Sequence, residues 1–127
     1  MRIASVLLGL PLVASVLITC IQGPRHLSWQ WPVHAQHHLL GHITTVVGLS
    51  VVSLLLVVGP LQRRERWAWW ALVVTGVSLF GGFWLGNLMV GLGEPGAVPN
   101  TSQALQASVY LLGLVLAWRG VSVRASA

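Results

Sequence analysis

The stretch from Leu39 to Leu61, LLGHITTVVGLSVVSLLLVVGPL, is apolar over most of its length and decides the fold class. It contains no Asp, Glu, Lys or Arg, and it ends around the helix-breaking pair Gly59-Pro60. About 20 consecutive, predominantly apolar residues are enough for a helix to cross the hydrocarbon core of a bilayer. The stretch therefore predicts a transmembrane helix.

Three further apolar runs have a similar character, over residues 3–21, 67–92 and 102–118. Charged residues make up only 7% of the 127 residues, whereas soluble proteins contain roughly 25%. The segment from Gly91 to Asn100 is rich in turn-forming residues and predicts a loop. The sequence thus predicts an all-α fold, with residues 1–127 forming a single transmembrane domain, an integral membrane four-helix bundle.

The arginines predict how this bundle is oriented. Four spans place both termini on one side, together with the loop that contains QRRER (residues 62–66). That side holds six arginines, and the other side holds only Arg25. Because cytoplasmic segments are enriched in Lys and Arg, we expect both termini in the cytoplasm. We expect a multi-pass protein of the plasma (inner) membrane, with the segment around the histidines outside.

The net charge of +5 follows from these topology-setting arginines, and no arginine stripe suits a nucleic acid. The single cysteine, Cys20, excludes an internal disulfide. LITC (residues 17–20) resembles a lipoprotein cleavage box, but Thr19 is larger than the residue usual before the cysteine. We therefore expect the first helix to be retained, with Cys20 unmodified.

Four of the five histidines lie in WPVHAQHHLLGH (residues 31–42), at the entrance to the second predicted helix. His34, His38 and His42 share one helix face if the helix begins early enough to include His34. Two imidazoles at positions i and i+4 can share a metal ion, and zinc or iron suits such ligands. This spacing predicts His34, His38 and His42 as metal ligands.

Acid–base chemistry without a metal is an alternative interpretation of the same segment. Histidine changes its charge near neutral pH, and Glu94 falls on the same predicted side of the membrane. His38, His42 and Glu94 are therefore predicted as catalytic residues. A haem held by two histidines is less favoured, because all five histidines lie within one segment.

Other polar residues fall at a similar predicted depth. Gln103, Gln106 and Tyr110 recur at i, i+3 and i+7 on one face of the fourth predicted helix. Polar groups inside a bilayer tend to face the bundle interior. The residues predicted to bind a substrate are Asn87, Gln103, Gln106, Tyr110 and Trp31. The same pattern also fits interhelical hydrogen bonds that hold a bundle together.

Two resemblances involve the histidine segment. HAQHH (residues 34–38) resembles one histidine box of the membrane fatty-acid desaturases and hydroxylases. That family uses several separated boxes, whereas this chain has one, so the resemblance does not extend to membership. WPVHAQHH (residues 31–38) resembles the Trp-Pro-x-His-Ala-x-x-His motif of small four-helix membrane proteins of unknown function. This second resemblance implies the same four-helix layout and implies no activity.

The sequence favours an enzyme-like site in the outer half of the bundle, built on the histidines with Glu94 and acting on a lipophilic small molecule. The site is metal-assisted or uses His and Glu as acid and base. The alternative is a non-catalytic membrane subunit or carrier whose histidines bind a metal ion or a partner. Membrane lipid is an expected partner, and glycines in the third run make a homo-oligomer plausible.

Overall fold

The computed structural model describes residues 1–90 and 97–122, and all regular structure within them is helical. Four helical segments are long and apolar enough to cross a membrane, with 21 to 26 residues each. The chain is therefore a four-helix, multi-pass membrane protein, as the sequence predicts. The elements are α1 (Arg2–Gln22), the 3-10 turn η1 (Gly23–His26), α2 (Val33–Val58), α3 (Arg66–Gly76), the π-helical turn η2 (Val77–Gly81), α4 (Gly82–Val90) and α5 (Ala97–Ser122).

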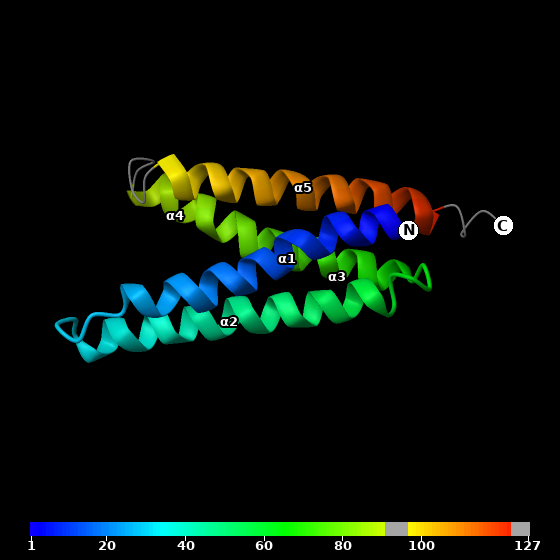
Figure 1. The fold of residues 1–127 in the computed structure, drawn as a ribbon. Coiled ribbons are helices and arrows are strands. Elements are labelled where there is room, and N and C mark those ends of the chain that lie inside the picture. The colour runs from blue at the N-terminus through cyan, green and yellow to red at the C-terminus, as the bar shows by residue number, and fades with distance from the viewer. Residues whose placement is uncertain (91–96, 123–127) are drawn as a thin grey trace.

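Consecutive spans run antiparallel, and η2 joins α3 and α4 into the third span (Figure 1). α1 packs against α2 and α5, and α3 contacts the same two helices. The start of α1, the α2–α3 connection and the end of α5 lie together, on the right of Figure 1. We call this the arginine end, and the opposite end, with the α1–α2 connection, the histidine end. The arginine end carries Arg2, Arg63, Arg64, Arg66 and Arg119.

The apolar core lies toward the arginine end. Leu8 and Leu12 of α1 pack there with Leu72 of α3, and all three are fully buried. At Gly113 α5 approaches α1 so closely that a Cβ would lie 2.9 Å from Leu8 Cγ. Small residues permit such close approach between membrane helices.

The helices diverge toward the histidine end, where the α1–α2 pair separates from the α4–α5 pair (Figure 1). The buried residues of α1 end at Leu12, and those of α2 begin only at Ser50. Among the described side chains of α4 none is buried. The bundle is therefore tightly packed at the arginine end and open at the histidine end.

The second helix begins earlier than the apolar run predicts, at Val33 instead of Leu39. Pro32 stands at its N-cap, and the Pro32 carbonyl accepts hydrogen bonds from the backbone N–H groups of Ala35 and Gln36. Proline fits the start of a helix, where a missing N–H costs nothing. The second helix therefore begins early enough to include His34, which the shared face of His34, His38 and His42 requires.

The third and fourth spans also differ from their predicted bounds. The third is predicted as one helix over 67–92, but the π-helical turn η2 interrupts it. The fourth begins at Ala97 instead of Ser102 and ends at Ser122 instead of Trp118. The predicted loop over 91–100 is thus wrong for its last residues, because Pro99 is tolerated in a first helical turn.

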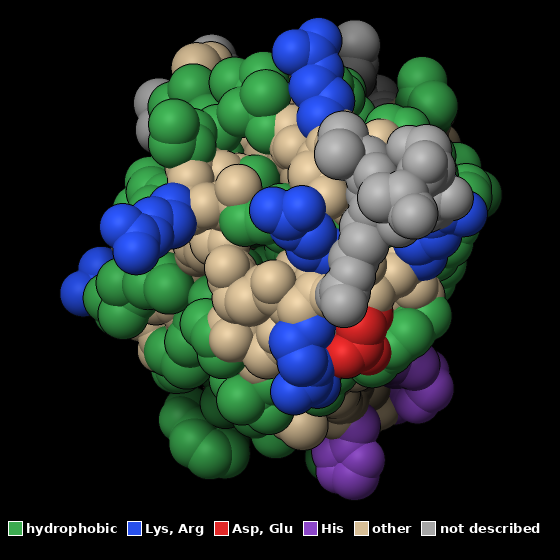
Figure 2. Space-filling model, turned by 90° about the vertical axis from the view of Figure 1, so that its right-hand side faces the viewer, with side chains coloured by type: hydrophobic (Ala, Val, Ile, Leu, Met, Phe, Trp, Pro, Cys, Tyr) green, Lys and Arg blue, Asp and Glu red, His purple; other side chains and the backbone are tan. Residues whose placement is uncertain are grey.

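The QRRER segment forms a tight turn at the arginine end. Arg64 has a φ of 60°, in the left-handed region. The Glu65 carboxylate accepts hydrogen bonds from Arg63 Nε, at 2.7 Å, and from Trp67 Nε1. These bonds hold the pKa of Glu65 below its ordinary value. Figure 2 looks onto this end and shows basic side chains around its rim.

Candidate functional site

A cleft lies between the two diverging helix pairs, in the half of the bundle toward the histidine end, and we call it the polar cleft. Its volume is about 280 Å³, and α1, α2, η2, α4 and α5 all contribute to its walls. Its apolar walls include Leu49 and Phe80. Its polar lining residues are Ser15, Thr19, His42, Thr45, Ser78, Gln103 and Gln106.

The two glutamines of α5 differ in how their side chains are bonded. Gln106 is buried, its Oε1 accepts from Ser15 Oγ of α1 at 3.2 Å, and its Nε2 donates to Ser102 Oγ at 3.1 Å. Gln103 Oε1 is also buried, but it has no hydrogen-bond partner among the described residues. A buried acceptor without a partner costs about 1–3 kcal/mol. Gln103 Oε1 is thus the one buried polar atom without a partner among the described side chains that line the cleft.

Two hydroxyls of the cleft are bonded within their own helices. Thr45 Oγ1 donates to the Gly41 carbonyl at 2.9 Å, and Ser78 Oγ donates to the Val74 carbonyl at 3.0 Å. Such bonds leave the oxygen lone pairs of the hydroxyls as further acceptors. Thr45 and Ser78 are both exposed to the cleft and its surroundings, so these acceptors are accessible.

His42 is the only titratable side chain among the described residues that line the cleft. It lies in the third turn of α2, at the open side of the cleft, and it is exposed. The sequence analysis grouped His42 with Gln103 and Gln106, and all three line this cleft; their functional role stays a prediction.

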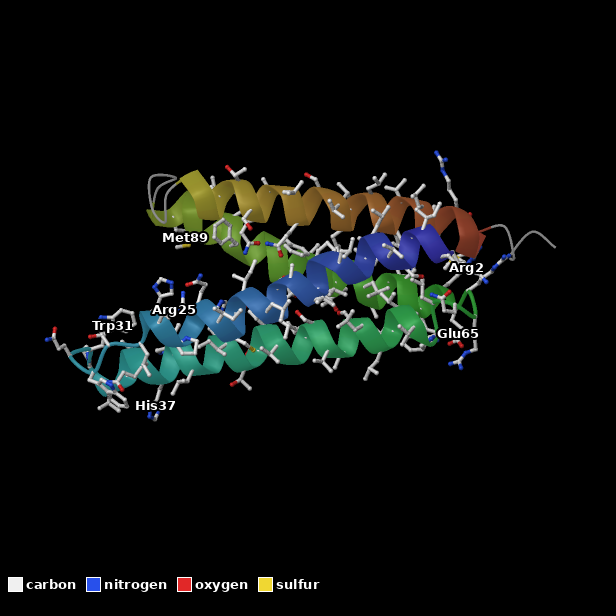
Figure 3. All side chains as sticks on the ribbon, viewed as in Figure 1. Arg2, Arg25, Trp31, His37, Glu65 and Met89 are labelled. Atoms are coloured by element: carbon white, nitrogen blue, oxygen red, sulfur yellow. The ribbon has the colours of Figure 1, made fainter. Side chains whose placement is uncertain are left out.

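The other histidines lie outside the cleft. His34 and His38 form an exposed pair on α2, with their Nε2 atoms 3.0 Å apart and their rings edge to face. Figure 3 shows His37 pointing away from the bundle. Within residues 1–90 and 97–122, no three His, Cys, Asp or Glu side chains are grouped to hold one metal ion. The predicted three-ligand set of His34, His38 and His42 is therefore not assembled there.

Other predicted site residues also lie away from the cleft lining. Trp31 is beside the α1–α2 connection, where its carbonyl accepts from Gln36 Nε2 at 2.9 Å (Figure 3). Tyr110 is buried, and its hydroxyl donates to the Leu72 carbonyl of α3 at 2.9 Å. The predicted roles of Glu94 and of the Asn87 side chain fall outside the part of the chain that the structure describes.

The sequence analysis did not single out the contribution of α1 to this site. Ser15 and Thr19 of α1 both line the cleft, and Ser15 makes its hydrogen bond across to α5. Their i and i+4 spacing puts both on one face of an otherwise apolar helix. That pair of small polar residues is the signal that would have identified them.

Comparisons with family models, with curated proteins and with solved structures give no match for this chain. The likeness of WPVHAQHH to other small membrane proteins therefore stays a prediction. The function must be inferred from the geometry of the cleft and of the histidines.

Proposed function

We propose that this protein binds an amphipathic small molecule in the polar cleft, with His42 as the group that takes up or releases a proton. The observation that carries the proposal is the unpartnered Gln103 Oε1, buried at a cleft of about 280 Å³. A hydroxyl or N–H of a ligand would satisfy this oxygen. A bound ligand would thereby remove the cost of an unpaired acceptor in an apolar bundle.

The polar residues of the cleft exceed what helix packing needs. Among the side-chain hydrogen bonds that the described cleft residues make, only the one from Ser15 to Gln106 joins two different spans. Thr45 and Ser78 bond their own helix backbones and hold no helices together. A purely structural role would use such costly polar groups in interhelical bonds. This favours a binding site over a scaffold.

The distribution of arginines supports an orientation for the site. With the arginine end in the cytoplasm of a plasma (inner) membrane, the histidine end and the mouth of the cleft would lie in the outer half of the bilayer. A lipophilic ligand would then enter from the outer leaflet.

Photolabelling tests the binding proposal. The protein is placed in phosphatidylcholine nanodiscs with a long-chain alcohol that carries a diazirine beside its hydroxyl. We expect labels on cleft residues of α2 and α5, and about tenfold less labelling in Gln103→Leu, since a loss of about 1.4 kcal/mol is tenfold in affinity. His37→Ala, on the face of α2 that points away from the bundle, is the matched control. Equal labelling of Gln103→Leu and His37→Ala would refute the proposal.

The role of His42 needs a separate variant. His42→Gln keeps a polar side chain at the cleft but cannot change its charge. We expect this variant to retain alcohol binding and to lose any dependence of binding on pH that the unmodified protein shows, because glutamine has no ionisable group. If the same pH dependence persists in His42→Gln, another group carries the proton.

Metal binding by His34 and His38 is a second candidate function. Their Nε2 atoms are 3.0 Å apart, and two imidazole nitrogens at about 2.0–2.1 Å from one zinc ion can be that close. Water would supply the remaining ligands. Zinc titration by calorimetry should show one site that His38→Ala abolishes and His37→Ala leaves intact. Absence of saturable zinc binding by the unmodified protein would eliminate this candidate.

A further inference from the structure

A second hollow lies on the outer surface of the bundle, between the α3–η2–α4 span and α5, and we call it the apolar groove. Its volume is about 450 Å³, and its lining is almost wholly apolar. Val77 and Leu111 on its rim are 67% and 61% exposed, so the groove is open to the surroundings of the bundle. In a bilayer those surroundings are lipid chains. Its apolar lining residues include Val73, Val77, Trp84, Leu111, Leu114 and Val115.

Phe80 lies between the apolar groove and the polar cleft. Among the described residues it is the one that belongs to the lining of both hollows. Its side chain is buried, with 6% exposed, and its ring centroid is 5.3 Å from that of Tyr110. The hydroxyl of Tyr110 is tied to the Leu72 carbonyl, so the tyrosine ring is anchored on one side of this contact. The phenyl ring of Phe80 is therefore a shared wall between the two hollows.

The backbone around Phe80 is irregular. Phe80 lies in the π-helical turn η2, and such turns occur frequently at functional sites. Gly81 and Gly82 follow it, and a Cβ at Gly82 would meet nothing within 4 Å. There is thus open space at Gly82, next to the turn that contains Phe80.

We infer that the polar cleft and the apolar groove form one binding site for a single-tailed amphiphile with an uncharged, hydrogen-bonding head. The head lies against Gln103, the tail lies in the groove, and Phe80 is the movable wall between them. This inference rests on the proposed function and adds the class of ligand. The position of Phe80 in the linings of both hollows is what assigns the groove to the tail of the same molecule.

The lack of charged side chains among the described residues of the cleft favours an uncharged head group. No Arg, Lys, Asp or Glu is among the described residues that line it. A carboxylate or phosphate would lose its hydration there without a fixed cation to replace it. The exposed hydroxyls of Thr45 and Ser78 offer acceptor lone pairs, and Gln103 Oε1 lacks a donor, so a hydroxyl or an amide N–H fits best. Long-chain alcohols, amides and monoacylglycerols have this chemistry.

Two photoreactive alcohols of equal chain length test where the tail lies. One carries the diazirine beside the hydroxyl and the other carries it in the middle of the chain, both in phosphatidylcholine nanodiscs. Because lipid chains are as apolar as the groove, the position of the label is more informative than affinity. We expect the head probe to label the polar cleft and the tail probe to label the groove around Val77 and Leu111.

Substitutions at exposed positions test the place of the tail without disturbing the packed core. Leu111→Trp fills the groove, and we expect it to reduce labelling of the groove by the tail probe about tenfold. Leu55→Trp on α2 is the control, because Leu55 is 62% exposed and lines neither hollow. If the tail probe labels all lipid-facing helices equally while the head probe still labels the cleft, the inference fails and the proposed function stands. If neither probe labels a particular site, both fail.

Competition at equal mole fraction in the bilayer tests the head group. The unlabelled alcohol should displace the head probe at least about tenfold better than a fatty acid of the same chain length or phosphatidylcholine. Equal displacement by the fatty acid would overturn the uncharged head. Phe80→Ala removes the shared wall, and we expect it to increase labelling of the groove by the tail probe severalfold. Unchanged labelling of a folded Phe80→Ala protein would overturn the role of Phe80.

Discussion

Replacing Gly113 by alanine tests the contact that sets the distance between α1 and α5. The new Cβ would lie 2.9 Å from Leu8 Cγ and 3.0 Å from the Leu8 backbone nitrogen. Carbon atoms in favourable contact are about 3.5–4.0 Å apart, so one helix must move. Overpacking of this kind costs about 1–3 kcal/mol, whereas replacing a helical glycine by alanine contributes up to about 1 kcal/mol of stability. We expect Gly113→Ala to range from neutral to about 2 kcal/mol less stable than the unmodified protein.

Gly48→Ala is the matched control, because Gly48 lies within α2 and a Cβ there meets nothing within 4 Å. It gains the same helix propensity without the steric cost, so the difference between the two variants isolates the overpacking. We expect Gly48→Ala to be more stable than Gly113→Ala by about 1–3 kcal/mol. Unfolding in detergent micelles, followed by tryptophan fluorescence and circular dichroism, measures both. Equal stability of the two variants would refute the close α1–α5 contact.

The remaining predictions concern single groups. Ser53 Oγ is buried without a partner among the described residues, so Ser53→Ala should leave the free energy of unfolding unchanged or raise it; a loss above about 1 kcal/mol would indicate a missing partner. Tyr110→Phe removes the hydrogen bond to the Leu72 carbonyl and should cost about 0.6–1.7 kcal/mol in the same unfolding assay. The lowered pKa of Glu65 implies that its ionised carboxylate stabilises the folded protein above pH 4.5, the ordinary pKa value. This stabilisation is lost as the pH falls through the lowered pKa, so Glu65→Gln should remove this acid-dependent component from the unfolding curves. A phosphatase fused at the C-terminus should be inactive and a fluorescent protein active, and the reverse result would contradict the cytoplasmic termini.

Periodicity explains which parts of the site could be predicted. A period of 3.6 residues placed His34, His38 and His42 on one face of a helix, and α2 does carry all three. The same reasoning grouped Gln103 with Gln106, and both line the cleft. Periodicity gives the direction of a side chain relative to its own helix. It does not give the direction relative to a neighbouring helix, which depends on how the helices rotate and cross.

Because periodicity does not show how neighbouring helices are arranged, the structure separates some residues that the sequence analysis had grouped. His42 lines the cleft, whereas His34 and His38 pair on the exposed surface nearer the start of α2, where the helices have diverged. Tyr110 shares a predicted face with Gln103 and Gln106, but it lies further toward the packed end, where its hydroxyl reaches the backbone of α3. The point at which the helices diverge, which a helical pattern does not contain, decides which residues face the cleft and which face the core.

The sequence by itself determined the four membrane spans, because the length and low charge of an apolar run are enough to specify a helix in a bilayer. It also determined the polar faces of the second and fourth helices. The tertiary structure alone decided that the spans close around Leu8 and Gly113 and open toward the histidine end. It alone placed Phe80 between a polar and an apolar hollow, on a π-helical turn. These features depend on contacts between residues far apart in the chain, and close packing selects them only when all four spans are assembled.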